Sequence, residues 1–176
     1  MELKCAGIEE IADMGEGSRV EIDFIDALAD DEGVLVGDTA KGFLLVLAET
    51  RETETYPPRP FRVNAGAIHQ YVYLGNDKTK YLSELKAGDQ LLVTNGIDER
   101  FVAIGRVKIE RREFLRFCLE TGISATLQKA DSLFVAGEKG AFHCIDAAVN
   151  DRIHYVEMKS AARHKGLPIK ESITEK

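Results

Sequence analysis

The fold is decided by the stretch GVLVGDTAKGFLLVL, residues 33–47. It contains two short apolar runs, 33–37 and 43–47, joined by a polar segment that ends in glycine. Such runs are typical of strands that are buried on both faces or joined in a hairpin. Upstream, Val20 to Phe24 alternates strictly between apolar and charged residues, which predicts a further strand.

The rest of the chain repeats this theme of short strands between turn signals. Helix signals are few, and residues 23–28 and 81–85 each predict at most one turn. Because no amphipathic segment is long enough for a crossover helix, the pattern argues against a βαβ nucleotide fold. We therefore predict a mainly β protein of small barrel-like sheets, with repeated turn–strand elements and few short helices. Further strands are predicted at 67–74, 90–94, 101–109, 113–119, 132–135 and 152–156.

One turn–strand element recurs three times, at residues 16–22, 87–93 and 149–155. Each copy has Gly or Asn, then Ser or Asp, then a polar residue and an apolar residue that opens a strand. Gly and Asn accept positive φ, and the Ser or Asp side chain bonds to the turn backbone. We interpret this signature as strand-start geometry rather than as a functional signal.

The length of 176 residues fits one domain or two small ones. Residues 49–60 are polar and carry two consecutive prolines, so they form either a linker or a stiff arm that presents the residues after it. We predict an N-terminal β subdomain at 1–50 and a C-terminal β subdomain at 51–176. One compact domain over 1–176 is the alternative.

Charge and cysteine content exclude several classes of function. The chain has 23 basic and 30 acidic residues, a net charge of −7, so we expect no binding to nucleic acid. No run approaches the roughly 20 apolar residues that cross a bilayer, so we expect no membrane span. The isolated cysteines, Cys5, Cys118 and Cys144, suit reduced thiols and predict a cytoplasmic protein.

The densest set of chemically capable residues lies at 59–71, RPFRVNAGAIHQY. Arginine offers a bidentate fork for a carboxylate or phosphate, Asn64 an orienting donor, and His69 a group that titrates near neutral pH. This stretch therefore predicts a site for a small anion. The alternative is that its arginines pair with neighbouring acids and that His69 closes a core hydrogen bond.

Two further charged stretches extend this hypothesis. Lys78 and Lys80 alternate onto one side of a strand before Tyr81, and they form either the far wall of an anion site or a solvated hairpin. Residues 105–112 place their charged side chains on one face, which fits a binding strip or cross-strand ion pairs. The histidine and cysteine spacing predicts no metal site, although it leaves the need for a divalent metal open.

Three long ungapped runs, residues 59–69, 78–89 and 105–112, resemble the archaeal-type (class II) 3-dehydroquinate synthases. Shorter matches occur at 33–37, 49–50 and 127–128. The resemblance covers nearly the whole chain but only the C-terminal half of the family's longer proteins. It therefore implies a separate protein partner that carries the N-terminal half.

The resemblance implies an NAD-dependent oxidative deamination of an amino-dideoxy-heptulosonate, followed by ring closure to 3-dehydroquinate. For this chain it implies enolisation or ring closure on a small anionic substrate that derives from a keto-acid or an amino sugar. If the NAD site lies mainly in the absent half, this chain cannot run the redox step alone. Catalytic roles are implied for His69, Glu49 and Tyr81. Substrate binding is implied for Arg59, Arg62, Asn64, Lys78, Lys80, Arg106 and Lys108.

Two other functions remain as alternatives. In the first, the chain is a non-catalytic module that binds a small anion, an alternative suggested by Leu47 and Ala48, which stand where the family has His-Ser. Alternatively its role is structural, in which exposed strand edges form a homo-oligomer and residues 56–60 clasp a neighbour. A homo-oligomer is expected for the enzyme as well.

Overall fold

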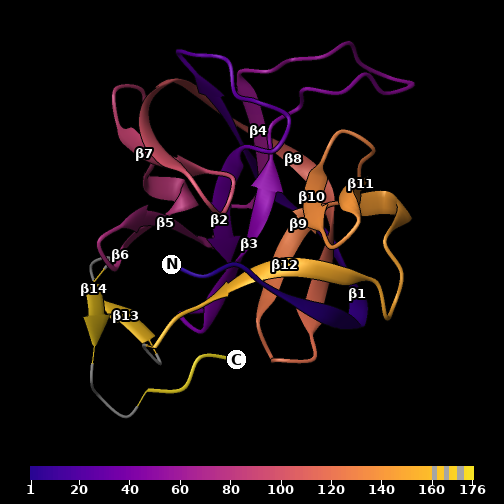
Figure 1. Cartoon of the computed structure of the whole chain (residues 1–176), viewed down its shortest axis with the longest axis vertical. Coiled ribbons are helices and arrows are strands. Elements are labelled where there is room, and N and C mark those ends of the chain that lie inside the picture. The colour runs from indigo at the N-terminus through magenta and orange to yellow at the C-terminus, as the bar shows by residue number, and fades with distance from the viewer. Residues whose placement is uncertain (160–161, 165–166, 170–172) are drawn as a thin grey trace.

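Two long antiparallel strands form the backbone of the structure, a computed structural model that describes residues 1–159, 162–164, 167–169 and 173–176. They are β1 (Lys4–Phe24) and β8 (Glu99–Leu119), which pair from Ile8 opposite Leu119 to Phe24 opposite Ile104. The outer edge of β1 pairs with β12 (Arg152–Glu157) near one end and with β4 (Arg62–Ala67) near the other. The outer edge of β8 pairs in the same way with β7 (Gln90–Thr94) and β9 (Ser124–Gln128) (Figure 1).

A ring of strands closes on this ribbon. β12 pairs with β3 (Gly42–Leu47), β3 with β2 (Gly33–Gly37), and β2 with β7. The ring is uneven because β1 and β8 extend beyond it, so it resembles a barrel only loosely. The prediction of a mainly β fold is confirmed. Short hairpins complete the fold: β5 (Tyr71–Gly75) with β6 (Lys78–Tyr81), β10 (Phe134–Gly137) with β11 (Gly140–His143), and β13 (Ala162–His164) with β14 (Leu167–Ile169).

The helices of the described residues are two single 3-10 turns, η1 (Leu82–Glu84) and η2 (Cys144–Asp146). The predicted turn at 81–85 is confirmed by η1. The predicted turn at 23–28 is wrong, because Asp23 and Phe24 still belong to the β1 ladder and the backbone N–H of Phe24 donates to the carbonyl of Phe61. None of the described helices is long and apolar enough to cross a membrane.

The turn–strand element is confirmed as strand-start geometry in two of its three copies. Gly88 and Asn150 have φ of +93° and +79°. An aspartate follows each of them and accepts a backbone N–H bond within the turn: Asp89 from Lys86, and Asp151 from Ala148. The first copy, at 16–22, is wrong as a strand start because it lies inside β1. The two true copies each come after a hairpin and a 3-10 turn, so the fold contains an internal repeat.

Strand boundaries differ from the predictions where distant pairing decides them. The strands predicted at 101–109 and 113–119 are one continuous strand, β8, because β1 pairs along its whole length. The strand predicted at 67–74 is divided by a turn at 68–70. Strands from both sides of residue 50 hydrogen-bond to one another, so we describe the chain as a single unit.

The alternation in β1 gives its second half two different faces. Val20, Ile22 and Phe24 point into the main apolar core, which also receives side chains from β2, β3 and β8. The alternate residues, among them Glu21 and Asp23, are buried on the opposite face. Residues 50–60, hereafter the arm, project from the body of the protein above this face (Figure 1).

Gly66 in β4 sets how closely β4 and β9 approach each other. It has φ of +91°, and a Cβ there would lie 2.5 Å from the carbonyl oxygen of Thr126. We expect Gly66→Ala to destabilise the protein by about 3 kcal/mol, from backbone strain and from the clash together. Gly88→Ala is the matched control, because Gly88 has nearly the same φ with open space around it, and should cost only about 1–2 kcal/mol. Equal losses in urea unfolding would contradict this account.

Candidate functional site

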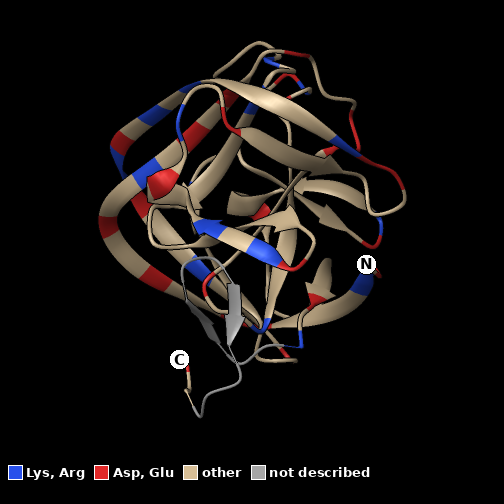
Figure 2. Ribbon diagram, turned by 90° about the vertical axis from the view of Figure 1, so that its left-hand side faces the viewer, with Lys and Arg blue, Asp and Glu red and all other residues tan. Residues whose placement is uncertain are grey.

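Charged side chains from three neighbouring strands cover the buried outer face of β1. Glu21 lies opposite Lys108 and Asp23 opposite Arg106 across the β1–β8 ladder. Arg19 lies opposite Glu110 in the same ladder, so each row joins opposite charges. The alternation of basic and acidic residues is visible along the long strands (Figure 2).

Asp23 is the most heavily bonded acid of this face. Arg62 of β4 forms a fork on it, with Nε 2.8 Å from Oδ1 and Nη2 3.1 Å from Oδ2. Arg106 Nε donates to Oδ2 at 2.8 Å. Burial alone would raise the pKa of the Asp23 carboxyl, but the hydrogen bonds and charges of Arg62 and Arg106 outweigh it and hold that pKa below its ordinary value. Asp23 is therefore an ionised anchor for both arginines.

Gln128 of β9 connects the cluster to a fourth strand. Its Oε1 accepts hydrogen bonds from Arg19 Nη1 at 2.8 Å and from Asn64 Nδ2 at 2.7 Å. Asn64 is buried, and its Oδ1 has no hydrogen-bond partner. Arg19 Nε is also without one. Buried polar atoms in native proteins are almost always satisfied, so these exceptions mark a candidate ligand site.

Glu49 lies two residues after the end of β3, and only 2% of its surface is exposed. Its Oε1 accepts a hydrogen bond from Arg59 Nη2, whereas its Oε2 has no partner. Burial raises the pKa of the Glu49 carboxyl to about 7, opposed by the charges of Arg59 and Arg62 and reinforced by Glu21. Glu49 is therefore poised to hold or release a proton near neutral pH.

A cavity of about 310 Å³, hereafter the charged cavity, lies over these strands. The arm supplies part of its wall through Thr55 and Tyr56. Tyr56 stacks on the Arg59 guanidinium at 4.2 Å, and Thr55 Oγ1 donates to Asp131 Oδ2 at 3.1 Å. Three lining side chains are acidic: Glu21, Glu110 and Asp131. Five are cationic: Arg19, Arg59, Arg62, Lys108 and Arg112.

This excess of positive charge suits a small anion. Arg59, Lys108 and Arg112 keep 20%, 39% and 40% of their side chains exposed, so they can reach a ligand. Arg19 and Arg62 are more deeply buried and already hold Gln128 and Asp23. The deeper arginines thus shape the site. The shallower cations are paired as well, Arg59 with Glu49 and both Lys108 and Arg112 with Glu110, so a ligand would have to displace these carboxylates.

The structure brings together six of the ten residues that the sequence indicated for the site. Arg59, Arg62 and Lys108 line the charged cavity. Three others stand behind that wall: Glu49 on Arg59, Asn64 on Gln128, and Arg106 on Asp23. The arginines pair with acids, as the alternative interpretation expected, and they also face a cavity; anion binding there stays a prediction.

The other four do not line this cavity. His69 is exposed and its Nε2 lies 2.8 Å from Asp38 Oδ1, which also accepts a hydrogen bond from Thr126 Oγ1. The remaining three belong to the β5–β6 hairpin, where Lys78 is exposed, Lys80 pairs with Asp89 and Tyr81 stacks on Tyr71. Their catalytic or binding roles stay predictions about a different surface.

Sequence reasoning missed Arg19, Glu21, Asp23, Arg112 and Asp131. The first three belong to one alternating segment, and residues 105–112 alternate with complementary charge. Pairing the two segments in antiparallel register would have placed their charged faces together. Nothing local marks Asp131, which joins the site through the arm.

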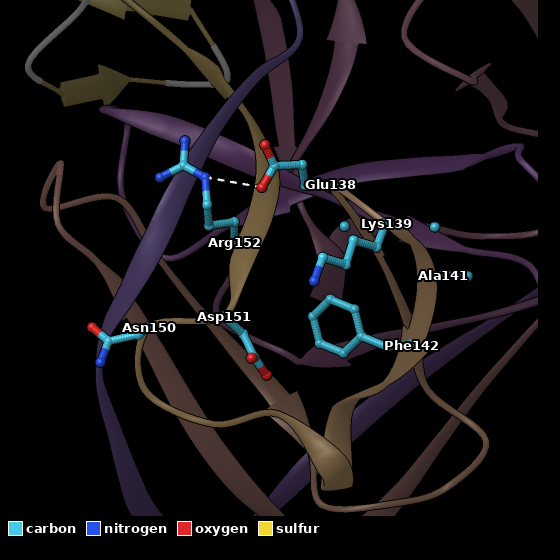
Figure 3. A pocket seen from close by; sticks show the side chains of 9 residues that line it. Glu138, Lys139, Ala141, Phe142, Asn150, Asp151 and Arg152 are labelled. Atoms are coloured by element: carbon cyan, nitrogen blue, oxygen red, sulfur yellow. Dashed lines mark ion pairs between the residues drawn. The ribbon is translucent and has the colours of Figure 1, made fainter.

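A larger cavity of about 460 Å³ lies beside β11 and the turn that precedes β12 (Figure 3). Its two cations are Lys139 and Arg152, and Arg152 is paired with Glu138 at 3.0 Å. No buried polar atom without a hydrogen-bond partner occurs among its lining residues, all of which the structure describes. The charged cavity is therefore the better candidate despite its smaller size.

The proton on Glu49 has a measurable effect on stability. Because its pKa is higher folded, at about 7, than unfolded, near 4.5, the folded state binds more protons between these values. Its contribution to stability is therefore lost as pH rises from about 4.5 to 7, by up to about 2–3 kcal/mol. We expect Glu49→Gln, which keeps the bond from Arg59, to gain stability over the unmodified protein as pH rises through this window.

Denaturant unfolding of both proteins at several pH values measures this difference. Glu138→Gln is the control, because Glu138 belongs to an exposed ion pair. A difference between the Glu49 variant and the unmodified protein that does not vary with pH would contradict the assignment.

Comparison with known proteins identifies the family. The family model described as the 3-dehydroquinate synthase II C-terminal domain matches residues 5–176. The 3-dehydroquinate synthase of Methanocella arvoryzae is 44% identical over 96% of this chain and 46% of its own length. Those of Methanoculleus marisnigri and Methanococcus maripaludis are 41% and 40% identical, over 96% and 100% of this chain and 53% and 50% of theirs.

The chain thus spans about half the length of the curated relatives it matches. No solved structure matches it. With a family model that covers almost every residue, the chain belongs to the family of 3-dehydroquinate synthase II C-terminal domains.

Proposed function

We propose that this domain binds the anionic substrate of a 3-dehydroquinate-synthase-type reaction in the charged cavity and takes part in ring closure. The relatives that share its sequence are named 3-dehydroquinate synthase, and each is about twice as long. The observation that carries the proposal is a cavity with two more cations than anions, beside buried donors that lack partners, Arg19 Nε and Arg59 Nε.

The substrate in this proposal is an amino-dideoxy-heptulosonate, a polyhydroxy keto-acid. Its carboxylate binds among the partly exposed cations Arg59, Lys108 and Arg112, because charge-assisted bonds to guanidinium groups are strong and directional. Its hydroxyl groups donate to carboxylates that line the cavity, such as Asp131. Holding both ends of a flexible chain brings the reacting carbons together.

Glu49 is the proton donor for ring closure in this proposal. When the enolate carbon attacks the carbonyl carbon, a carbon–carbon bond forms and the π electrons move to the carbonyl oxygen. That oxygen then takes a proton, and a buried carboxyl with a pKa of about 7 is suited to deliver it. Arg59 stands between Glu49 and the cavity, so it must shift toward the substrate carboxylate first.

The redox step is proposed to need a second protein. Among the described residues no helix exceeds a single 3-10 turn, so they offer no helix N-terminus of the kind that cradles a dinucleotide pyrophosphate. The described residues thus do not fit NAD in that manner, and we derive no redox step on them. We propose that NAD binds to a partner that carries the family's N-terminal half.

A second candidate is a binding module without turnover. Leu47 and Ala48, directly before Glu49, are buried apolar residues where the sequence comparison led us to expect His-Ser. The two residues that precede Glu49 in the chain therefore supply no second titratable group. The two functions share the anion site and differ only in chemistry.

Binding is tested with quinate, a stable hydroxy-carboxylate. We expect Lys108→Gln and Arg112→Gln each to weaken binding roughly ten- to hundredfold, because each removes a charge-assisted contact worth about 1.5–3 kcal/mol. Glu21, the buried partner of Lys108, keeps Arg19 and Arg62, and Glu110, the partner of Arg112, is one-third exposed, so neither change leaves a buried charge unpaired. Arg100→Gln is the control, since Arg100 pairs with Asp26 and Glu32 away from the cavity. Calorimetric titration that ranks all three alike would contradict the site.

Turnover is tested by incubating the chain with amino-heptulosonate and NAD, alone and with a protein that carries the N-terminal half. NADH and a cyclised product only in the mixture support the enzyme. Quinate binding without product in either sample supports the binding module. Light scattering of the same samples measures the expected complex and the expected homo-oligomer.

A further inference from the structure

Arg59 is shared between two roles in the charged cavity. Its guanidinium donates through Nη2 to Glu49, stacks on Tyr56, and keeps a buried Nε without a partner. It also lines the cavity, where it is one of the three cations exposed enough to meet a ligand. If the guanidinium turns to form hydrogen bonds with a ligand carboxylate, its hydrogen bond to Glu49 is weakened or broken.

Glu49 has nothing to replace Arg59. Its second oxygen lacks a partner already, and its side chain is only 3% exposed, so water cannot easily solvate a freed charge. The charged groups that face it are Arg59 from the arm, Arg62 from β4 and Glu21 from β1. Arg62 is committed to Asp23 by two hydrogen bonds, and Glu21 repels a second negative charge.

From this geometry we infer that anion binding in the charged cavity is coupled to uptake of one proton by Glu49, with Arg59 passing from Glu49 to the ligand. The inference deepens the proposed function and rests on it, since it concerns the same site. Two effects act in one direction. The ligand draws Arg59 away from Glu49, and the ligand's own negative charge lies close to a buried carboxylate. Both favour the protonated carboxyl.

The coupling has a functional consequence. If ligand binding and proton uptake occur together, Glu49 is protonated in the complex and can donate the proton that ring closure requires. Above pH 7 the carboxylate form of Glu49 prevails in the empty site and forms the ion pair with Arg59. The pH dependence of ligand affinity therefore reports whether anion binding and proton uptake by Glu49 are coupled.

The probe is quinate, titrated by calorimetry at about pH 7.5 in two buffers of different ionisation enthalpy. We expect uptake of about half a proton per quinate, and an affinity that falls about three- to fivefold from pH 7 to pH 8. Glu49→Gln should bind quinate with no net proton exchange and no change in affinity over this range. Asp131→Asn is the matched control, because it removes a carboxylate of the same cavity that bonds to Thr55 rather than to Arg59.

Each result decides the matter. Proton uptake that disappears in Glu49→Gln and persists in Asp131→Asn supports the coupling. Uptake that persists in Glu49→Gln, or binding without uptake by the unmodified protein, overturns the coupling and leaves the anion site intact. Absence of quinate binding by a folded protein overturns both the coupling and the proposed function.

A direct measurement covers the case in which the variant fails to fold. Carbon-13 NMR of the unmodified protein, labelled at glutamate carboxyl carbons, tracks the titration of Glu49 with and without quinate. A Glu49 midpoint that moves to higher pH with quinate supports the coupling, and an unmoved midpoint overturns it.

Discussion

The antiparallel pairing of β1 with β8 is the constraint on which the rest of the structure depends. Each strand has 21 residues, several times the usual strand length, and each lends both ends to shorter strands. The ring closes because β12 pairs with one end of this two-stranded ribbon and β7 with the other. Their register also places Asp23 opposite Arg106 and Glu21 opposite Lys108, so one ladder sets both the scaffold and the charges.

Stability does not explain the charges on this ladder. Buried ion pairs are weak evidence of stabilisation, because the desolvation of each charge offsets much of the attraction. Here the cluster also keeps Asn64 Oδ1 and Glu49 Oε2 without partners, which an apolar face would not do. These unpaired atoms do not come from optimal packing, and they lie at the site where we propose that an anion binds.

The sequence predicts elements well where neighbours in the chain decide them. The segment 33–47 forms the predicted hairpin, β2 with β3, because its apolar runs and its turn lie together. The length of β1 was not predictable locally, since Gly15 and Gly17 interrupt its apolar pattern and only β8 keeps that segment extended.

In the candidate site too, contacts between chain neighbours were predictable and contacts between distant segments were not. Arg59 and Arg62 are close in sequence and both line the cavity, whereas Gln128 reaches Asn64 only through the packing of β9. His69 was expected at the same site because it belongs to the same stretch, residues 59–71. The positive φ of Gly66 and the turn at 68–70 redirect the chain, and His69 meets Asp38 instead.

The arm begins and ends at the same ion pair, since Glu49 precedes it, Arg59 lies at its far end, and the two also pair as an isolated bridge. Its ends are therefore fixed whatever lies between them. Lengthening a closed loop costs little, about 0.6 kcal/mol per doubling. Insertions between residues 51 and 54 can thus accumulate during evolution. They would change the part of the cavity wall that the arm supplies and leave the charged residues of the strands in place.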